Sequence, residues 1–164
     1  EEIVQTSSVW ARALLGRPPP LCADTDEQRA TIGVRPAGAF LFTPDRTELQ
    51  LWGACDFPPE QIGMRIPADL GLPGLVARTG EPLVVTNTEE DPRFLQIIAT
   101  GRAGSTVQAP VKVNGDCLGL VFAASMAKNV YWPEDLEALL VFADLTAAAI
   151  RASGDLSRFD PPRP

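Results

Sequence analysis

The dipeptide Asn114-Gly115 constrains the fold of this chain more than any other feature. Both residues tolerate the left-handed backbone of a two-residue hairpin turn. Apolar stretches flank the dipeptide on both sides, from Ser105 to Val113 and from Asp116 to Met126. The sequence therefore predicts that these two stretches form an antiparallel hairpin.

A second hairpin is predicted earlier in the chain. Residues 38–42 are apolar, residues 43–46 read Thr-Pro-Asp-Arg, and the stretch 48–55 alternates with a period of two. A further short strand is expected at 83–86, and an extended piece at 64–66. Two hairpins in one chain favour an antiparallel sheet.

Helices are expected at both ends of the chain and around the middle strand. The terminal ones span residues 1–17 and 133–152, and the second is apolar almost all round, so it must be covered on more than one side. A helix of about one and a half turns is expected after Leu72-Pro73-Gly74, ending at Gly80 as a left-handed cap. Two more short helices are expected, within residues 21–31 and from Asp91 to Ile98, with Asp91 as the N-cap. The fold class is α+β.

We expect three segments: an N-terminal helix with a Pro-rich linker over residues 1–20, one domain over 21–152, and a disordered tail or linker over 153–164. The chain begins at Glu1 inside an expected helix, which indicates a module of a longer protein. No apolar run approaches the roughly 20 residues that cross a bilayer.

The composition narrows the possible functions. The formal net charge of −7 argues against nucleic acid as a partner. Histidine is absent, which removes the usual general base, the commonest zinc ligand and the usual haem ligand. Three cysteines without a CxxC motif indicate reduced thiols in a cytoplasmic protein. We therefore expect no enzyme, no metal and no cofactor.

Several motifs in order resemble the GAF domain family, over roughly residues 20–152. They are Gly71-Leu72-Pro73-Gly74-Leu75-Val76-Ala77-Arg78-Thr79-Gly80-Glu81-Pro82, Val84-Val85, Asp91-Pro92-Arg93-Phe94, Ser105-Thr106-Val107-Gln108-Ala109-Pro110-Val111, Asn114-Gly115, Leu118-Gly119-Leu120-Val121 and Trp132-Pro133-Glu134-Asp135-Leu136. The resemblance implies a PAS-like antiparallel sheet of five to six strands. Terminal helices would cover one face, and short helices and loops would cover a small-molecule pocket on the other.

The resemblance also implies a sensory or dimerising module attached to a kinase, cyclase, phosphodiesterase or transcription regulator. The residues of the specialised subfamilies are mostly missing. Phytochrome-like members attach a bilin to a Cys that usually stands beside a His, and this chain has no His. Members that bind cyclic nucleotides have an Asn-Lys pair, whereas this chain has Ala127-Lys128. The family's free methionine-R-sulfoxide reductases have their cysteines between the two hairpins, where residues 56–116 contain none.

The hairpin register suggests where a ligand would bind. Counting back from the turn pairs Gln108 with Val121 and Thr106 with Ala123 on a small, slightly polar face, while Leu118, Leu120 and Phe122 lie on the bulky face toward the terminal helices. A bulge at Pro110 would exchange the faces beyond it. The candidate ligand-binding residues are Trp52, Leu75, Asn87, Asp91, Phe94, Ile98, Ser105, Thr106, Gln108 and Val121.

Alternatives remain for several of these residues. Asn87 and Asp91 are also suited to turns and caps, and Trp52 to covering the core. A buried Gln108 would need water or a ligand as a hydrogen-bond partner.

Three functions are considered for the whole chain. The first is a non-catalytic sensory domain that binds an unidentified small molecule and signals to an output domain through its terminal helices. The alternative is a structural dimerisation module with no ligand, and a cysteine-based redox enzyme is the third. For the first two, we expect a homodimer through residues 1–17 and 133–152.

Overall fold

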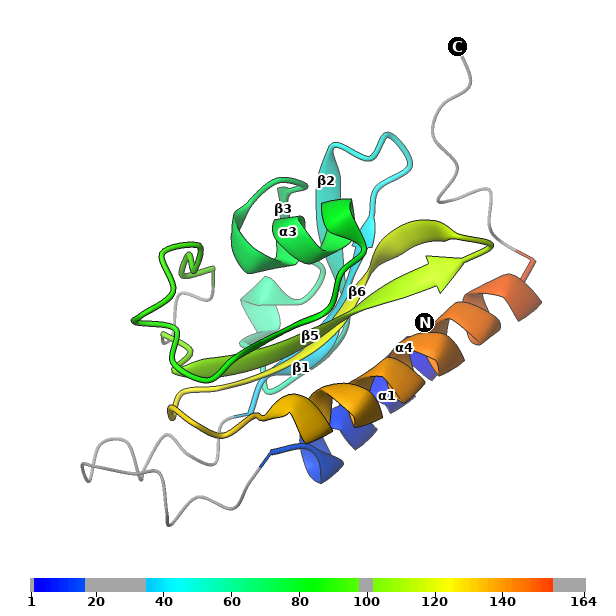
Figure 1. The fold of residues 1–164 in the computed structure, drawn as a ribbon. Helices are drawn as coiled ribbons and strands as arrows, with labels where there is room; N and C mark the ends of the chain where they lie inside the picture. Colours follow the sequence, from blue (N-terminus) through cyan, green and yellow to red (C-terminus); the bar gives the residue numbers. More distant parts are fainter. Residues whose placement is uncertain (1, 17–34, 98–101, 155–164) are drawn as a thin grey trace.

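A six-stranded antiparallel sheet forms the centre of the protein (Figure 1). The computed structural model describes residues 2–16, 35–97 and 102–154. The order of the strands across the sheet is β3-β2-β1-β6-β5-β4. Along the chain the elements are α1 (Glu2–Leu14), β1 (Ala37–Phe42), β2 (Glu48–Cys55), the 3-10 turn η2 (Pro59–Gln61), β3 (Arg65–Pro67), α3 (Gly71–Thr79), β4 (Leu83–Val85), β5 (Ser105–Val113), β6 (Asp116–Ser125) and α4 (Pro133–Ala152). The predicted α+β class is confirmed.

The two faces of the sheet are covered by different elements. Helices α1 and α4 lie side by side on one face, and α3 lies on the other (Figure 1). The core is divided accordingly into two clusters. The cluster on the α1/α4 face includes Val107, Val121 and Leu139, and the cluster on the α3 face includes Phe40, Leu120 and Phe122. The sheet is thus buried on both sides at its centre, which explains why β1 and most of β6 are continuously apolar.

Both predicted hairpins are present. Strands β1 and β2 pair antiparallel, and β5 and β6 pair with Val113 opposite Asp116 and Lys112 opposite Cys117, as expected from the Asn114-Gly115 turn. The short strand predicted at 83–86 is also found as β4, which is one residue shorter than predicted.

Beyond Cys117 the predicted register is wrong by one residue. A bulge places Val111 opposite Gly119, so Gln108 pairs with Phe122 instead of Val121. Gly119 has a φ of 145°, and a Cβ there would lie 2.1 Å from the carbonyl oxygen of Phe40. Glycine therefore permits a close approach of β6 to β1 that no other residue allows.

The bulge exchanges the two faces of β6. Leu120 and Phe122, predicted to face the terminal helices, lie in the α3-side cluster. Val121 and Ala123, predicted to face the pocket, lie in the cluster under α1 and α4. The predicted small-residued pocket face is thus wrong for β6, because the bulge occurs at Leu118-Gly119 and not at Pro110.

Helix α3 starts one residue before the predicted Leu72 and ends at the predicted Gly80 cap. It has nine residues instead of one and a half turns, and Gly80 caps it in the left-handed conformation with a φ of 67°. The short helix predicted from Asp91 is not formed by residues 91–97. The Asp91 carboxylate accepts a hydrogen bond from the Arg93 backbone N–H at 2.9 Å, so it closes a local turn instead of capping a helix. The helix predicted within residues 21–31 lies outside the described residues.

The terminal helices are joined where α4 begins. Asp135 accepts hydrogen bonds from the backbone N–H of Trp132 at 2.8 Å and from that of Gly16, just after α1, at 2.7 Å. Its carboxylate thereby satisfies donors at the α4 N-terminus. Helix α4 has the predicted bounds, and Val4, Ala11 and Leu15 are the buried side of the N-terminal segment. Among the described residues, none of the helices has the length and apolar character needed to cross a membrane.

Candidate functional site

A partly open cavity lies between α3 and the sheet. The space open to the centre of a water molecule is about 60 Å³, which exceeds what a single water needs. Strands β1, β5 and β6, the start of α3 and the segments around it form the walls. The lining residues are Phe40, Phe57, Leu72, Pro73, Phe94, Leu95, Gln96, Ile97, Ala103, Thr106, Gln108, Phe122 and Ala124.

Aromatic rings form one wall of the cavity. Phe40 and Phe122 stack with their ring centres 5.4 Å apart, and Phe57 meets Phe122 edge-on at 6.0 Å. At the other side, the Arg102 guanidinium lies 5.5 Å from the centre of the Phe94 ring. The wall is therefore rigid and apolar, and it suits flat or aliphatic groups.

Gln108 is the exceptional polar residue of the lining. Its side chain comes from β5 between β4 and β6, and the residue is only 5% exposed. Its Oε1 atom is buried without a hydrogen-bond partner among the described residues. Leaving a buried acceptor unsatisfied costs about 1–3 kcal/mol, so this atom is a site where a donor from a bound molecule would be stabilised.

The other polar groups near the cavity already have partners. The Thr106 hydroxyl donates to the Ala123 carbonyl at 3.0 Å. The Ala124 carbonyl accepts a hydrogen bond from the Tyr131 hydroxyl, also at 3.0 Å. Burial raises the pKa of Tyr131 above its ordinary value, so the hydroxyl remains a donor.

Of the predicted ligand-binding residues, Phe94, Thr106 and Gln108 line the cavity together. Two others lie on the face of the sheet opposite the cavity. Val121 faces α1 and α4 because of the bulge in β6. Trp52 packs against the same cluster, since it pairs with Ala39 on the helix-covered face.

Leu75 and Ser105 lie away from the cavity wall. Leu75 is half-buried on α3, whose residues Leu72 and Pro73 form the wall instead. The Ser105 hydroxyl donates to the Ala127 carbonyl at 2.7 Å, which fixes the start of β5. The predicted Ile98 lies outside the described residues.

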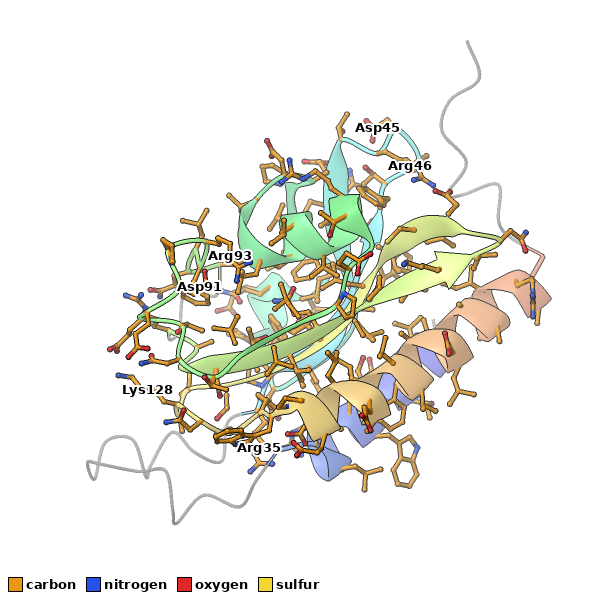
Figure 2. All side chains as sticks on the ribbon, viewed as in Figure 1. Arg35, Asp45, Arg46, Asp91, Arg93 and Lys128 are labelled. Carbon is orange, nitrogen blue, oxygen red and sulfur yellow. The ribbon has the colours of Figure 1, made fainter. Side chains whose placement is uncertain are left out.

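Asn87 and Asp91 are turn residues on the surface. The Asn87 amide donates to Glu90 Oε1 at 2.8 Å, and the Arg93 guanidinium lies 2.6 Å from Asp91. The hydrogen bond from Arg93 holds the pKa of Asp91 below its usual range. Figure 2 shows Asp91 and Arg93 together on the segment after β4.

Sequence reasoning missed most of the apolar wall, above all Phe40, Phe57 and Phe122. Phe122 has the same side orientation as Gln108, because the two residues pair across the hairpin. A glycine inside a predicted strand often marks a bulge, so Gly119 was the available signal. No comparable signal in the sequence points to Phe57, which lies in the loop after β2.

The described cysteines have no features of reactive thiols. Burial raises the pKa of both Cys55 and Cys117. Neither residue lines the cavity. In the part of the chain that the structure describes, no group of three or more His, Cys, Asp or Glu side chains is placed to hold a metal ion.

The sequence matches the family model of the GAF domain over residues 11–150. No curated protein sequence matches it significantly.

Solved structures resemble this fold over most of their length. The GAF domain of a phosphoenolpyruvate-protein phosphotransferase from Acinetobacter has a TM-score of 0.68 and 17% identity, with 94% of this chain and 92% of that one covered. The second GAF domain of DevS from Mycobacterium smegmatis has a TM-score of 0.65 and 17% identity, with 96% of each covered. The free methionine-R-sulfoxide reductase from Neisseria meningitidis, solved with its substrate, has a TM-score of 0.62 and 22% identity, covering 74% and 70%. At these identities the likeness concerns the fold.

Proposed function

The chain belongs to the GAF domain family, and on that premise we propose that it is a non-catalytic sensory domain that binds a small molecule between α3 and the sheet. The observation that carries this proposal is the buried Gln108 Oε1 atom, which has no hydrogen-bond partner among the described residues and belongs to a cavity-lining side chain. A bound molecule would satisfy it and fill the space around it.

The chemistry of the cavity supports a binding role over a catalytic one. None of the described lining residues carries a thiol, a carboxylate or an amine. The whole sequence lacks histidine, so no imidazole is available as a general base. The reductase from Neisseria meningitidis proves that this fold can be an enzyme, but Cys55 and Cys117 lie outside the cavity here.

A short chain of contacts supports signalling through the terminal helices. Ala124 lines the cavity, and its carbonyl accepts a hydrogen bond from the hydroxyl of Tyr131, which lies two residues before the start of α4 at Pro133. Asp135 in the first turn of α4 in turn binds the backbone N–H of Gly16 after α1. A displacement of β6 by a ligand would therefore act directly on the segment that holds the two helices together.

A homodimer through α1 and α4 is the second part of the proposal, and also the basis of the alternative, a dimerisation module without ligand. The outer faces of these neighbouring helices expose large apolar side chains, among them Trp10 at 52%, Leu14 at 64% and Val141 at 58%. Such residues are often buried when two copies associate.

The free thiols of Cys55 and Cys117 support a reducing compartment, the cytoplasm.

Native mass spectrometry of the freshly purified protein, compared with its denatured mass, tests the binding function. A sensory domain is expected to show additional mass that disappears on denaturation. If the protein shows no extra mass and no thermal shift with any compound of a metabolite library, the dimerisation module is favoured.

Sedimentation tests the dimer. We expect Trp10→Glu to convert a dimer to a monomer, because it places a charge in the proposed interface. Ile62→Glu is the matched control, since Ile62 is 62% exposed but lies in the loop after β2. A wild-type monomer at high micromolar concentration would contradict the dimer.

A further inference from the structure

We propose that the molecule bound in this cavity is uncharged, has an aromatic or similarly flat apolar body of about one ring, and carries a hydroxyl or N–H group that donates to Gln108 Oε1. This inference rests on the proposed binding function and specifies its ligand. Three properties of the cavity carry it: the character of its walls, its lack of charge and the state of the Gln108 amide.

The walls favour a small aromatic body. Phe40 and Phe122 present stacked rings, Phe57 meets them edge-on, and Leu72 and Pro73 close the space from α3. Aromatic rings pack well against such a surface in offset or edge-on arrangements. The space open to the centre of a water molecule, about 60 Å³, suits one ring better than a large fused ring system.

The absence of charge in the walls disfavours ions. None of the described lining residues is charged, so a carboxylate or phosphate inside would lose its hydration without gaining a counter-ion. A cation beside the lining is Arg102, an exposed residue whose guanidinium lies over the ring of the lining residue Phe94. An anion could meet it only at the rim.

The Gln108 amide determines the polar group of the ligand. Its oxygen is buried, it lacks a donor from the described residues, and the residue is 95% enclosed by the protein. A ligand hydroxyl or N–H would restore the missing hydrogen bond. A hydroxyl also accepts hydrogen bonds, so it fits the amide in either of its two flipped orientations.

The test is isothermal titration calorimetry with three probes of nearly equal size: phenol, toluene and benzoate. Phenol and toluene differ in one hydroxyl for one methyl group, and benzoate adds a negative charge. Each is titrated into the wild-type protein, Gln108→Met and Gln50→Met. Methionine keeps the length of the side chain and removes the amide, and Gln50 on β2 is a matched control outside the cavity.

We expect phenol to bind the wild-type protein and benzoate to bind more weakly than phenol. The preference for phenol over toluene should fall about tenfold in Gln108→Met, the size expected for one hydrogen bond, and stay unchanged in Gln50→Met. Comparing the phenol-to-toluene affinity ratio of the variant with that of the wild type cancels the difference in dehydration cost between phenol and toluene. Because methionine replaces an unsatisfied buried amide, the Gln108→Met variant is expected to fold.

Other results would overturn the inference in distinguishable ways. An unchanged phenol preference in Gln108→Met would remove the donor requirement and leave small-molecule binding intact. Tighter binding of benzoate than of phenol would overturn the neutral ligand. If none of the probes binds while native mass spectrometry finds a bound molecule, the ligand class is wrong and the binding function stands. If neither experiment finds binding, both proposals fail.

Discussion

The two faces of the sheet are built from similar residues but differ in the hydrogen bonding of their buried polar groups. Under α1 and α4, the buried hydroxyls of Ser105, Tyr131 and Thr146 each donate to a backbone carbonyl, at 2.7–3.0 Å. Under α3, the sheet is bordered by a cavity, and the buried amide oxygen of Gln108 is unsatisfied among the described residues. These hydroxyls on the first face are satisfied within the protein, and the amide oxygen on the second face is not.

The proposed function assigns stability mainly to the first face and ligand binding to the second. A face with satisfied polar groups and close packing stabilises the folded state. A face with a cavity and an unsatisfied acceptor sacrifices stability, and such a sacrifice is common where a molecule binds. The comparison can be tested by changing each face separately.

The largest effect is expected on the closed face. Leu139→Ala removes a side chain of α4 that is fully buried, so the free energy of unfolding should fall by about 2–5 kcal/mol. Leu145→Ala on the same helix is the control, because Leu145 is 54% exposed, and it should change stability by less than about 0.5 kcal/mol. Urea denaturation measures both. Equal losses would show that the helices pack differently.

The next effect concerns Tyr131. Its ring packs in the cluster under α1 and α4, and its hydroxyl donates to the carbonyl of Ala124, a residue that lines the cavity. Tyr131→Phe should cost about 1–2 kcal/mol at neutral pH, because the Ala124 carbonyl loses its donor. Burial raises the pKa of Tyr131 in the folded state, whereas the unfolded value is near 10. Both states are neutral below pH 10, and above it the unfolded chain loses its proton first. Stability should therefore fall as the pH rises past 10.

Tyr131 is the only tyrosine in the chain, which makes its ionisation directly observable. Absorbance at the tyrosinate band should stay flat in the folded protein at pH values where the unfolded protein ionises. Tyr131→Phe should lack this contribution to the pH dependence. Ionisation near pH 10 in the folded protein would mean that the hydroxyl is accessible to water.

A smaller effect of opposite sign is expected on the open face. Gln108→Met should raise the stability of the ligand-free protein by about 1 kcal/mol, or about 3 °C in melting temperature, because it removes an unsatisfied buried acceptor. Gln50→Met should leave the melting temperature nearly unchanged. A destabilised Gln108→Met would indicate that the amide already has a partner.

The smallest effect is expected at Arg93 and Asp91, which form an ion pair on the surface. Arg93→Gln should change stability by less than about 0.5 kcal/mol, because the Arg93 side chain is 56% exposed and its charge is screened by solvent. Phenol binding measured by calorimetry should also be unchanged, because neither residue lines the cavity. A clear loss of binding would extend the site to this turn.

Much of the fold could be predicted from local patterns. The Asn114-Gly115 turn, the alternation in β2 and the apolar α4 each have a strong local cause, and the structure agrees with them. The alternation of Leu49 and Leu51 with Trp52 identifies residues that share a face, but not which helix covers that face. Both faces of this sheet are buried, so burial alone does not distinguish them.

The candidate site was predicted only in part for the same reason. Thr106 and Gln108 were found because they are polar residues on one side of β5, and Phe94 because it belongs to a family motif. Phe122 was missed because the Gly119 bulge shifts the register by one residue, and the close approach to Phe40 that requires the bulge is a tertiary contact. Phe57 reaches the cavity from a loop whose path has no local signal.

The most direct test of this account is an amide NMR titration of the protein with phenol. The account predicts that the largest shift changes occur at the cavity-lining residues of β5, β6 and the start of α3, with Thr106, Gln108 and Phe122 prominent. Residues on the exposed faces of α1 and α4 should change less. Largest changes on those helices, or none anywhere at saturating phenol, would contradict the claim that the open face is the binding face.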